Sequence, residues 1–348
     1  MQDRYVVDEF CVIGVDLGGT NVRALAVDTS GKPLGEFASQ PSHAKEGASA
    51  VADACAEVAR SAERSSGRPC KAVGMAVPGH IDPEDGSVRW APNFGEYVEG
   101  VFRHFADVPL TAMVRERLGV PVCSGNDANL AALGEFMFGK REKRPNGLVM
   151  ITLGTGIGSG IVLCPGQLSG GEPPAAPLLL VGSNGGGAEL GHTVVFADGP
   201  QCGCGAYGCA EALVNANAII QRGRSKLEHD PSGLIARLSG GDPSRITPKL
   251  LADAAAQGDE SALEVWRETG HYLGVLIGNV INTFVPELVV LGGQISQAGT
   301  PLWEPTIRSA RNTAIPTLFS ATRIEPATEP ERAGVFGGAA LALQQLTS

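Results

Sequence analysis

The sequence predicts an α/β fold made of two similar lobes with a cleft between them. Residues 15–27 (VDLGGTNVRALAV) and 151–163 (ITLGTGIGSGIVL) share one pattern. Each is an apolar strand, a turn of glycine and threonine, and a second apolar run whose β-branched residues indicate a return strand. After each hairpin, stretches with helical spacing alternate with short apolar strands. A hairpin that occurs twice in this setting indicates two related α/β halves.

The remaining elements follow from local patterns. Apolar residues at helical spacing predict helices at 48–65, 109–119, 127–139, 259–284 and 333–346. Short apolar runs predict strands at 71–79 and 287–293. The first, smaller lobe is expected to span 1–124 and to be completed by the C-terminal helix at 333–348, and the larger lobe to span 125–332. The stretch from about 165 to 184 is rich in proline and glycine and is expected to be either a flap or an ordered surface loop.

Composition narrows the class of protein. The chain has 348 residues, 43% of them apolar and only 5% aromatic, with a formal charge of −10. Binding to duplex nucleic acid relies on Lys and Arg to neutralise phosphates, so an acidic chain is a poor candidate. Asp3, Asp8 and Glu9 interrupt any signal-peptide core, and no apolar run reaches the roughly 18 residues of a membrane span. We therefore expect a cytoplasmic protein that binds neither nucleic acid nor membrane.

The two hairpin turns have the composition of phosphate-binding loops. Glycine lets a phosphate approach backbone N–H groups closely, and threonine adds hydroxyl donors. Just before the first turn, Asp16 supplies a carboxylate that can hold Mg²⁺, directly or through water. Either turn alone could be an ordinary tight turn, but the pair predicts a clamp for a triphosphate. The expected donors are Gly18, Gly19, Thr20, Asn21, Thr155 and Gly156.

Two other nucleotide motifs match less well. The segment 134–141 (GEFMFGKR) is not a P-loop, because Arg141 stands where Ser or Thr must bind magnesium. A dinucleotide fingerprint in the second turn would need a glycine where Ser159 stands. NAD binding is therefore the weaker alternative to a triphosphate.

Residues 192–209 contain a complete ligand set for zinc. One histidine and three cysteines follow the pattern H-x9-C-x-C-x4-C, and the intervening glycines allow tight turns. Four protein ligands fill the zinc shell, so we predict a structural Zn²⁺ and keep unrelated free thiols as the alternative. The ligands are His192, Cys202, Cys204 and Cys209. The other cysteines are expected to be small core residues: Cys11, Cys55, Cys70, Cys123 and Cys164.

Two glutamates beside the zinc ligands are candidates for sugar binding. Glu189 lies three residues before His192, and Glu211 lies two residues after Cys209. A bound zinc ion would anchor both carboxylates near one point. Carboxylates accept pairs of hydroxyl hydrogen bonds, which is the chemistry of a sugar site.

Asn126 and Asp127 open the helix predicted at 127–139. Asp127 can orient an acceptor hydroxyl and take its proton during phosphoryl transfer, where positioning matters more than strong basicity. Asn126 would then hold an adjacent hydroxyl. Simple N-capping of the helix is the alternative for this pair.

Eight segments, in this order, resemble the ROK family of sugar kinases and sugar-responsive repressors: DLGGTN, VPGHID, APN, NDAN, TLGTGIGSG, ELGH, CGCGAYGCAE and ELVVLGG. The resemblance runs from about residue 11 to the C-terminal helix. It implies an actin- and hexokinase-like fold, in which two ribonuclease-H-like lobes close on sugar and ATP. It also implies a homodimer or homotetramer.

The resemblance also implies roles for single residues. Asp127 matches the catalytic base that acts on the primary hydroxyl of the sugar. Asn126, Glu189, His192 and Glu211 match sugar contacts, and Gly79 and Asn93 fall in segments that line the same pocket. Gly292 and Gly293 match the border of the adenosine site. The phosphate loops match Gly18, Gly19, Thr20, Thr155 and Gly156.

The expected function is the ATP-dependent phosphorylation of a hexose, with Mg-ATP as donor and glucose 6-phosphate as product. Fructose, mannose and N-acetylhexosamines remain alternative acceptors, because segments 96–110 and 165–184 look extended near the sugar or the lobe opening. A sugar-sensing regulator and an actin-like scaffold are the rivals. We expect no HTH-like segment before the first hairpin, which together with the presence of Asp127 argues against the regulator. The scaffold does not explain the zinc ligands.

Overall fold

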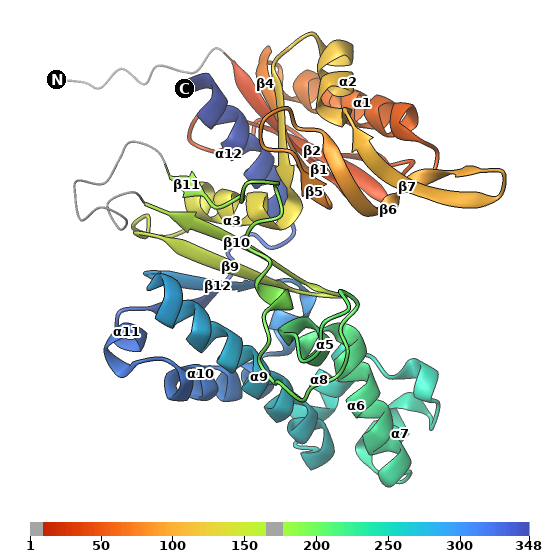
Figure 1. Ribbon diagram of the computed structural model, residues 1–348, viewed down its shortest axis with the longest axis vertical. Helices are drawn as coiled ribbons and strands as arrows, with labels where there is room; N and C mark the ends of the chain where they lie inside the picture. The colour runs from red at the N-terminus through yellow and green to blue at the C-terminus, as the bar shows by residue number, and fades with distance from the viewer. Residues whose placement is uncertain (1–9, 165–176, 348) are drawn as a thin grey trace. The chain divides into compact units, whose positions relative to one another are not determined.

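The computed structural model describes residues 10–164 and 177–347 (Figure 1). The chain divides into two compact units. Unit 1 comprises Met1–Arg144, Gly160–Ala188 and Thr328–Ser348, and unit 2 comprises Pro145–Ser159 and Glu189–Ala327. This division differs from the lobe boundary expected at residue 124. Helix α3 (Asp127–Phe138) belongs to unit 1 because it packs against α12 (Ala333–Thr347).

A five-stranded sheet in the order β3-β2-β1-β4-β8 forms the centre of unit 1. β1 and β2 pair antiparallel as the predicted hairpin, whereas β4 runs parallel to both β1 and β8. Alternate residues of β1 enter two cores, because successive side chains of a strand point to opposite faces. Ile13 packs with residues of α1, and Val12 packs with residues of α12. The strands are β1 (Cys11–Leu17), β2 (Asn21–Val27), β3 (Ala38–Pro41), β4 (Cys70–Val77) and β8 (Val122–Asn126).

Helices pack closely against this sheet. α1 (Ala48–Ser66) and α2 (Leu110–Leu118) lie side by side (Figure 1). α12 approaches the strands so closely that a Cβ on Gly14 would lie 1.8 Å from the carbonyl oxygen of Val335. Glycine in β1 is therefore a packing requirement for α12.

The second five-stranded sheet has the order β11-β10-β9-β12-β13, which repeats the order of the first. β9 and β10 are neighbours and correspond to the second predicted hairpin, and β12 runs parallel to both β9 and β13. The predicted duplication is therefore present in the strand order. The strands are β9 (Leu148–Leu153), β10 (Ile157–Leu163), β11 (Leu178–Leu179), β12 (Leu288–Gly292) and β13 (Arg323–Pro326).

Unit 2 is mainly helical outside its strands. α9 (Glu260–Phe284) fits against α10 (Thr300–Thr313) through glycines at positions 270, 274 and 278, where an added Cβ would lie within 2.4–2.7 Å of α10. Across the described residues, no helix is long and apolar enough to cross a membrane. The other helices are η1 (Leu190–His192), α5 (Ala210–Val214), α6 (Ala216–His229), α7 (Leu234–Ser239), η2 (Pro243–Arg245), α8 (Pro248–Ala256), η3 (Gln294–Ala298) and α11 (Pro316–Ser320).

The structure describes the whole of segment 96–110 but only part of segment 165–184, the two segments that were expected to be extended. The first forms most of a three-stranded sheet of β5 (His80–Ile81), β6 (Val88–Val98) and β7 (Val101–Val108). β6 and β7 are an antiparallel hairpin with a register shift between Ala91 and Gly95. Of the second, residues 165–176 lie outside the described part of the chain.

Candidate functional site

Two carboxylates of unit 1 lie close together at the ends of strands. Asp16 is near the end of β1, and Asp127 follows β8 as the first residue of α3. Burial and the negative charge of Asp127 together raise the pKa of Asp16 to about 6, against the opposing charge of Arg23. Burial also raises the pKa of Asp127. A pair of poorly solvated carboxylates is suited to hold a cation or to take up a proton.

Asn126 holds the start of α3 with both ends of its amide. Its Oδ1 accepts a hydrogen bond from the Asn129 backbone N–H at 3.1 Å, which is the N-cap interaction considered from the sequence. Its Nδ2 donates to the Gly79 carbonyl at 3.0 Å. Gly79 has φ +98°, and a Cβ there would lie 2.1 Å from the Trp90 carbonyl oxygen. The structure thus joins two of the predicted sugar residues, Asn126 and Gly79, beside Asp127.

The first glycine turn also lies in this part of unit 1. The Gly18 N–H donates to the Asn21 carbonyl at 2.9 Å, and Gly19, Thr20 and Asn21 are exposed. A Cβ on Gly19 would lie 3.8 Å from that of Asn93, so the turn adjoins the second predicted sugar segment. Unit 1 therefore brings this turn and Asn93 together.

The second glycine turn adjoins the predicted adenosine border in unit 2. The Gly154 N–H donates to the Gly156 carbonyl at 3.0 Å, and Thr155 between them is exposed. Gly292 pairs with Thr152 in the sheet register. Gly293 has φ +80°, and a Cβ there would lie 2.3 Å from the Leu153 carbonyl oxygen. Only glycine fits this close contact, which places both glycines next to the turn.

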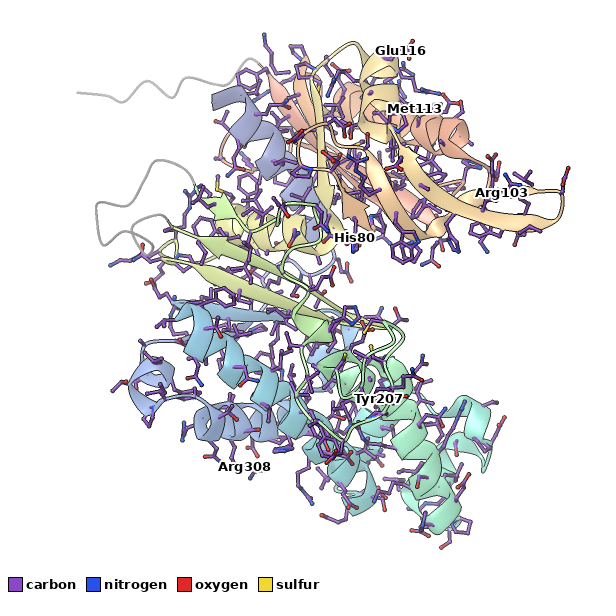
Figure 2. The ribbon with its side chains drawn as sticks, in the orientation of Figure 1. His80, Arg103, Met113, Glu116, Tyr207 and Arg308 are labelled. Carbon is purple, nitrogen blue, oxygen red and sulfur yellow. The ribbon has the colours of Figure 1, made fainter. Side chains whose placement is uncertain are left out.

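The predicted zinc ligands converge in unit 2. The donor atoms of His192, Cys202, Cys204 and Cys209 all lie within 4.8 Å of one another. The sulfur atoms of Cys204 and Cys209 are 3.7 Å apart, and the Cys202 sulfur is 3.6 Å from His192 Nδ1. A tetrahedron with Zn–S near 2.3 Å and Zn–N near 2.0–2.1 Å has edges of about 3.8 and 3.6 Å. The ligand set therefore fits a four-coordinate zinc ion. Tyr207, labelled in Figure 2, lies on the same loop.

Glu211 links this ligand cluster to the second glycine turn. Its Oε2 accepts a hydrogen bond from the Ile157 backbone N–H at 2.8 Å, and its Oε1 lies 3.7 Å from the Cys202 sulfur. A Cβ on Gly156 would lie 2.6 Å from Oε2, so a side chain there would displace the Glu211 carboxylate. The sequence singled out Glu211 for sugar binding but did not indicate its contact with the turn.

Glu189 lies at the start of η1, three residues before His192, and is exposed. The backbone N–H of the next residue, Leu190, donates to the Ser159 hydroxyl at 3.1 Å, which fixes η1 to β10. We did not predict a role for Ser159. Its part in placing Glu189 depends on a contact 31 residues away in the chain, for which the local sequence carries no signal.

Each unit therefore contains part of the predicted site. Unit 1 holds the proposed base, the first turn, and Asp16, Gly79, Asn93 and Asn126. Unit 2 holds the second turn, the zinc ligands, Glu189, Glu211, Gly292 and Gly293.

Comparisons with known proteins agree with this description. The ROK family matches residues 12–345. The glucokinase of Thermotoga maritima is 35% identical over 335 residues, covering 96% of this chain and 98% of that protein. A ROK hexokinase structure from Thermus thermophilus is 30% identical with a TM-score of 0.78, covering 97% of this chain and 99% of that chain.

A second solved structure contains ligands. It is a ROK family glucokinase from Streptomyces griseus in complex with glucose and AMPPNP, 31% identical with a TM-score of 0.73, and the match covers 96% of this chain and 99% of that chain. The two structural matches confirm the predicted fold class, a mixed α/β fold of the actin- and hexokinase-like type. Since the family match spans nearly the whole chain, this protein belongs to the ROK family.

Proposed function

We propose that this protein phosphorylates glucose at its primary hydroxyl with ATP as the donor. The observation that carries the proposal is the position of Asp127, a carboxylate with a raised pKa that begins α3. The support from relatives is specific, because glucokinases match this chain over nearly its full length at 35% and 31% identity, one of them in complex with glucose and an ATP analogue.

Asp127 is the proposed catalytic base. A raised pKa makes its carboxylate a better proton acceptor than an ordinary Asp, whose pKa is about 3.9. It would orient the sugar hydroxyl toward the γ-phosphate and take its proton as the new P–O bond forms. Asn126 keeps this carboxylate in place by capping α3 and tethering Gly79.

The phosphates of ATP are assigned to the two glycine turns. Backbone N–H groups of Gly19, Thr155 and Gly156 would donate to phosphate oxygens, with the hydroxyls of Thr20 and Thr155 and the amide of Asn21 beside them. The Gly18 N–H donates instead to the Asn21 carbonyl and so shapes the turn. Asp16 would hold Mg²⁺, directly or through water, and its neighbour Asp127 adds to the negative potential there. Bound Mg²⁺ supplies positive charge that neutralises the phosphates during transfer.

A structural zinc ion is assigned to His192, Cys202, Cys204 and Cys209, whose spacing fits it. All four positions of the ion are then filled by protein, so its contribution is to fix the loop. His192 Nδ1 lies 3.6 Å from the Cys202 sulfur and would be the metal ligand, which would leave Nε2 for a sugar hydroxyl. Glu189 and Glu211 flank this loop, and their carboxylates would accept hydrogen bonds from the sugar.

Several finer features belong to the proposal. Fructose, mannose and N-acetylhexosamines are alternative acceptors, because the named contacts recognise hydroxyls that many hexoses share. We further propose a homodimer or homotetramer that works in the cytoplasm in carbohydrate breakdown and does not bind nucleic acid.

The test is a panel of sugars with the purified protein and Mg-ATP. We expect ADP release with glucose and formation of glucose 6-phosphate, detected by a coupled dehydrogenase. If ADP is released with a different hexose and not with glucose, that hexose is the substrate. Sugar binding by calorimetry without turnover for any sugar would favour the sensor, and specific DNA binding in a gel-shift experiment would establish it.

A further inference from the structure

Cys11 and Cys70 face each other across two parallel strands. The sequence treats both as small core residues, but they are partners in the register of β1 and β4. Neighbouring strands lie about 4.7–4.9 Å apart, and a disulfide needs Cα atoms about 4.4–6.8 Å apart. Their thiols also share a side-chain hydrogen bond. The strand spacing at this pair, which lies beside a register shift between Cys11 and Val12, is thus within the range that a disulfide spans.

The surroundings of the pair stabilise a thiolate. The Ser66 hydroxyl donates to the Cys11 sulfur at 3.6 Å, and the cation of Arg68 lies nearby, while Glu63 opposes the negative charge. The hydrogen bond from Cys70, together with that of Ser66, lowers the pKa of Cys11 to about 7 and raises that of Cys70. Cys11 is thus the more acidic thiol of the pair. The Cys11 sulfur also lies 3.5 Å from the Arg68 carbonyl oxygen, and the Cys70 sulfur lies 3.3 Å from the Ala72 carbonyl oxygen.

A cavity gives a small oxidant access to this pair. It has a volume of about 240 Å³ and lies between β1, β4 and the helix α1, with Cys70 in its wall. Arg60, Glu63 and Arg64 of α1 also line it, so its wall is polar. Cys11 is fully buried, whereas Cys70 is partly exposed. Hydrogen peroxide would therefore reach Cys70 first.

We propose that Cys11 and Cys70 form a redox-active dithiol that hydrogen peroxide converts to a disulfide in the folded protein. The Cys11 thiolate takes the proton of the Cys70 thiol, and the accessible Cys70 sulfur then attacks the O–O bond and becomes a sulfenic acid, releasing hydroxide. The Cys11 sulfur then attacks the Cys70 sulfur, the S–S bond forms, and the displaced hydroxide takes the remaining thiol proton. In total two thiols and one peroxide give one disulfide and two water molecules, so sulfur is oxidised and peroxide oxygen is reduced.

Other cysteines provide internal controls. Cys55 is buried in α1, and burial raises its pKa to about 12, so it should remain a thiol. Burial also raises the pKa of Cys123 to about 12. In the zinc-loaded protein the three cysteine ligands are held by the metal, which slows their oxidation. The Cys11–Cys70 pair should therefore react before any of these.

The experiment treats zinc-loaded wild-type protein with stoichiometric hydrogen peroxide, blocks free thiols with iodoacetamide and maps peptides by mass spectrometry. We expect one new cross-link, Cys11–Cys70, which dithiothreitol reverses. A Cys55→Ser variant should form it unchanged. In Cys70→Ser it should be absent, and a sulfenic-acid probe should find Cys11 unreacted or slowly labelled, because Cys11 is buried.

Two results would overturn the proposal. One is that Cys11 and Cys70 both stay alkylatable in the oxidised wild-type protein, or cross-link only after unfolding in denaturant. The other is that cross-links among the zinc ligands form first. If Cys70→Ser does not fold, the wild-type peptide map decides the matter alone.

Discussion

The carboxylate of Glu211 accepts a hydrogen bond from the Ile157 backbone N–H at 2.8 Å, and this bond ties the zinc-ligand loop to the second glycine turn. The other carboxylate oxygen lies 3.7 Å from the sulfur of Cys202, one of the proposed zinc ligands. A single side chain therefore connects the proposed sugar-binding loop with the proposed phosphate turn. Loss of the Glu211 side chain is therefore expected to change the KM for glucose and the KM for ATP.

Substitution of Glu211 separates its two roles. Glu211→Gln keeps an acceptor for the Ile157 N–H but loses the charge, whereas Glu211→Ala loses both. We expect both variants to raise the KM for glucose, by ~10-fold or more, because a hydrogen bond to a charged group contributes about 1.5–3 kcal/mol. Only Glu211→Ala should also raise the KM for ATP. Steady-state kinetics with each substrate varied in turn will show whether the two variants differ in this way, and identical ATP constants would contradict the link.

Asn126 is predicted to act both as a cap and as a tether. Asn126→Ala removes both interactions and should lower the free energy of unfolding by ~1 kcal/mol, the usual effect of losing an N-cap. Asn126→Ser keeps the cap but not the donor to Gly79, so it should retain most of the stability. Both should raise the KM for glucose. Urea unfolding together with kinetics distinguishes the roles, and equal stability of the two variants would argue against the cap.

Asp16 should destabilise the metal-free protein at neutral pH. Its folded-state pKa is about 6 against an ordinary value of 3.8, so the folded state holds the proton more tightly than the unfolded state does. Stability therefore falls as the pH rises from about 4 to 6, where the unfolded state is ionised and the folded state still holds the proton. The loss reaches ~3 kcal/mol at about 1.4 kcal/mol per pKa unit. Asp16→Asn should raise the melting temperature at pH 7 without Mg²⁺, and the gain should disappear by pH 4.

Thermal melts of wild type and Asp16→Asn across this pH range test the prediction. Asp16→Asn should also lose most kinase activity with Mg-ATP, since the proposed metal ligand is absent. A constant difference in melting temperature at all pH values would mean that the Asp16 carboxyl is not the group that titrates.

The zinc site is expected to support sugar binding from the loop. Cys204→Ser removes one of the four ligands and should release the metal and raise the KM for glucose. Cys164→Ser is the matched control, because this cysteine lies outside the cluster. Metal content by mass spectrometry and sugar kinetics should change only in the first variant. An unchanged KM in zinc-free protein would refute the anchoring role.

Much of the fold could be predicted from local pattern. The helix α9 follows from a long amphipathic run, and the two glycine turns mark the hairpins because only backbone-permissive residues allow such turns. The sequence did not predict the β6–β7 hairpin and indicated only that segment 96–110 is longer than expected. Its register shift between Ala91 and Gly95 breaks the alternation of buried and exposed residues that identifies a strand.

The candidate site was predictable where ligands are close in sequence. The spacing of three cysteines within eight residues, after His192, was enough to predict that these side chains come together in a group that could hold a metal ion. The contacts of Glu211 with Ile157 and of Ser159 with Leu190 join residues 54 and 31 positions apart, so folding alone reveals them. The same holds for Cys11 and Cys70, which only the strand register brings together.

Asp127→Asn tests the central proposal most directly. The substitution keeps the shape of the side chain but removes the proton acceptor. We predict that ADP release from Mg-ATP with glucose falls by ~10²–10⁴-fold while zinc content and thermal stability are retained. Turnover close to that of the wild type in the folded, zinc-loaded variant would contradict the assignment of Asp127 as the catalytic base.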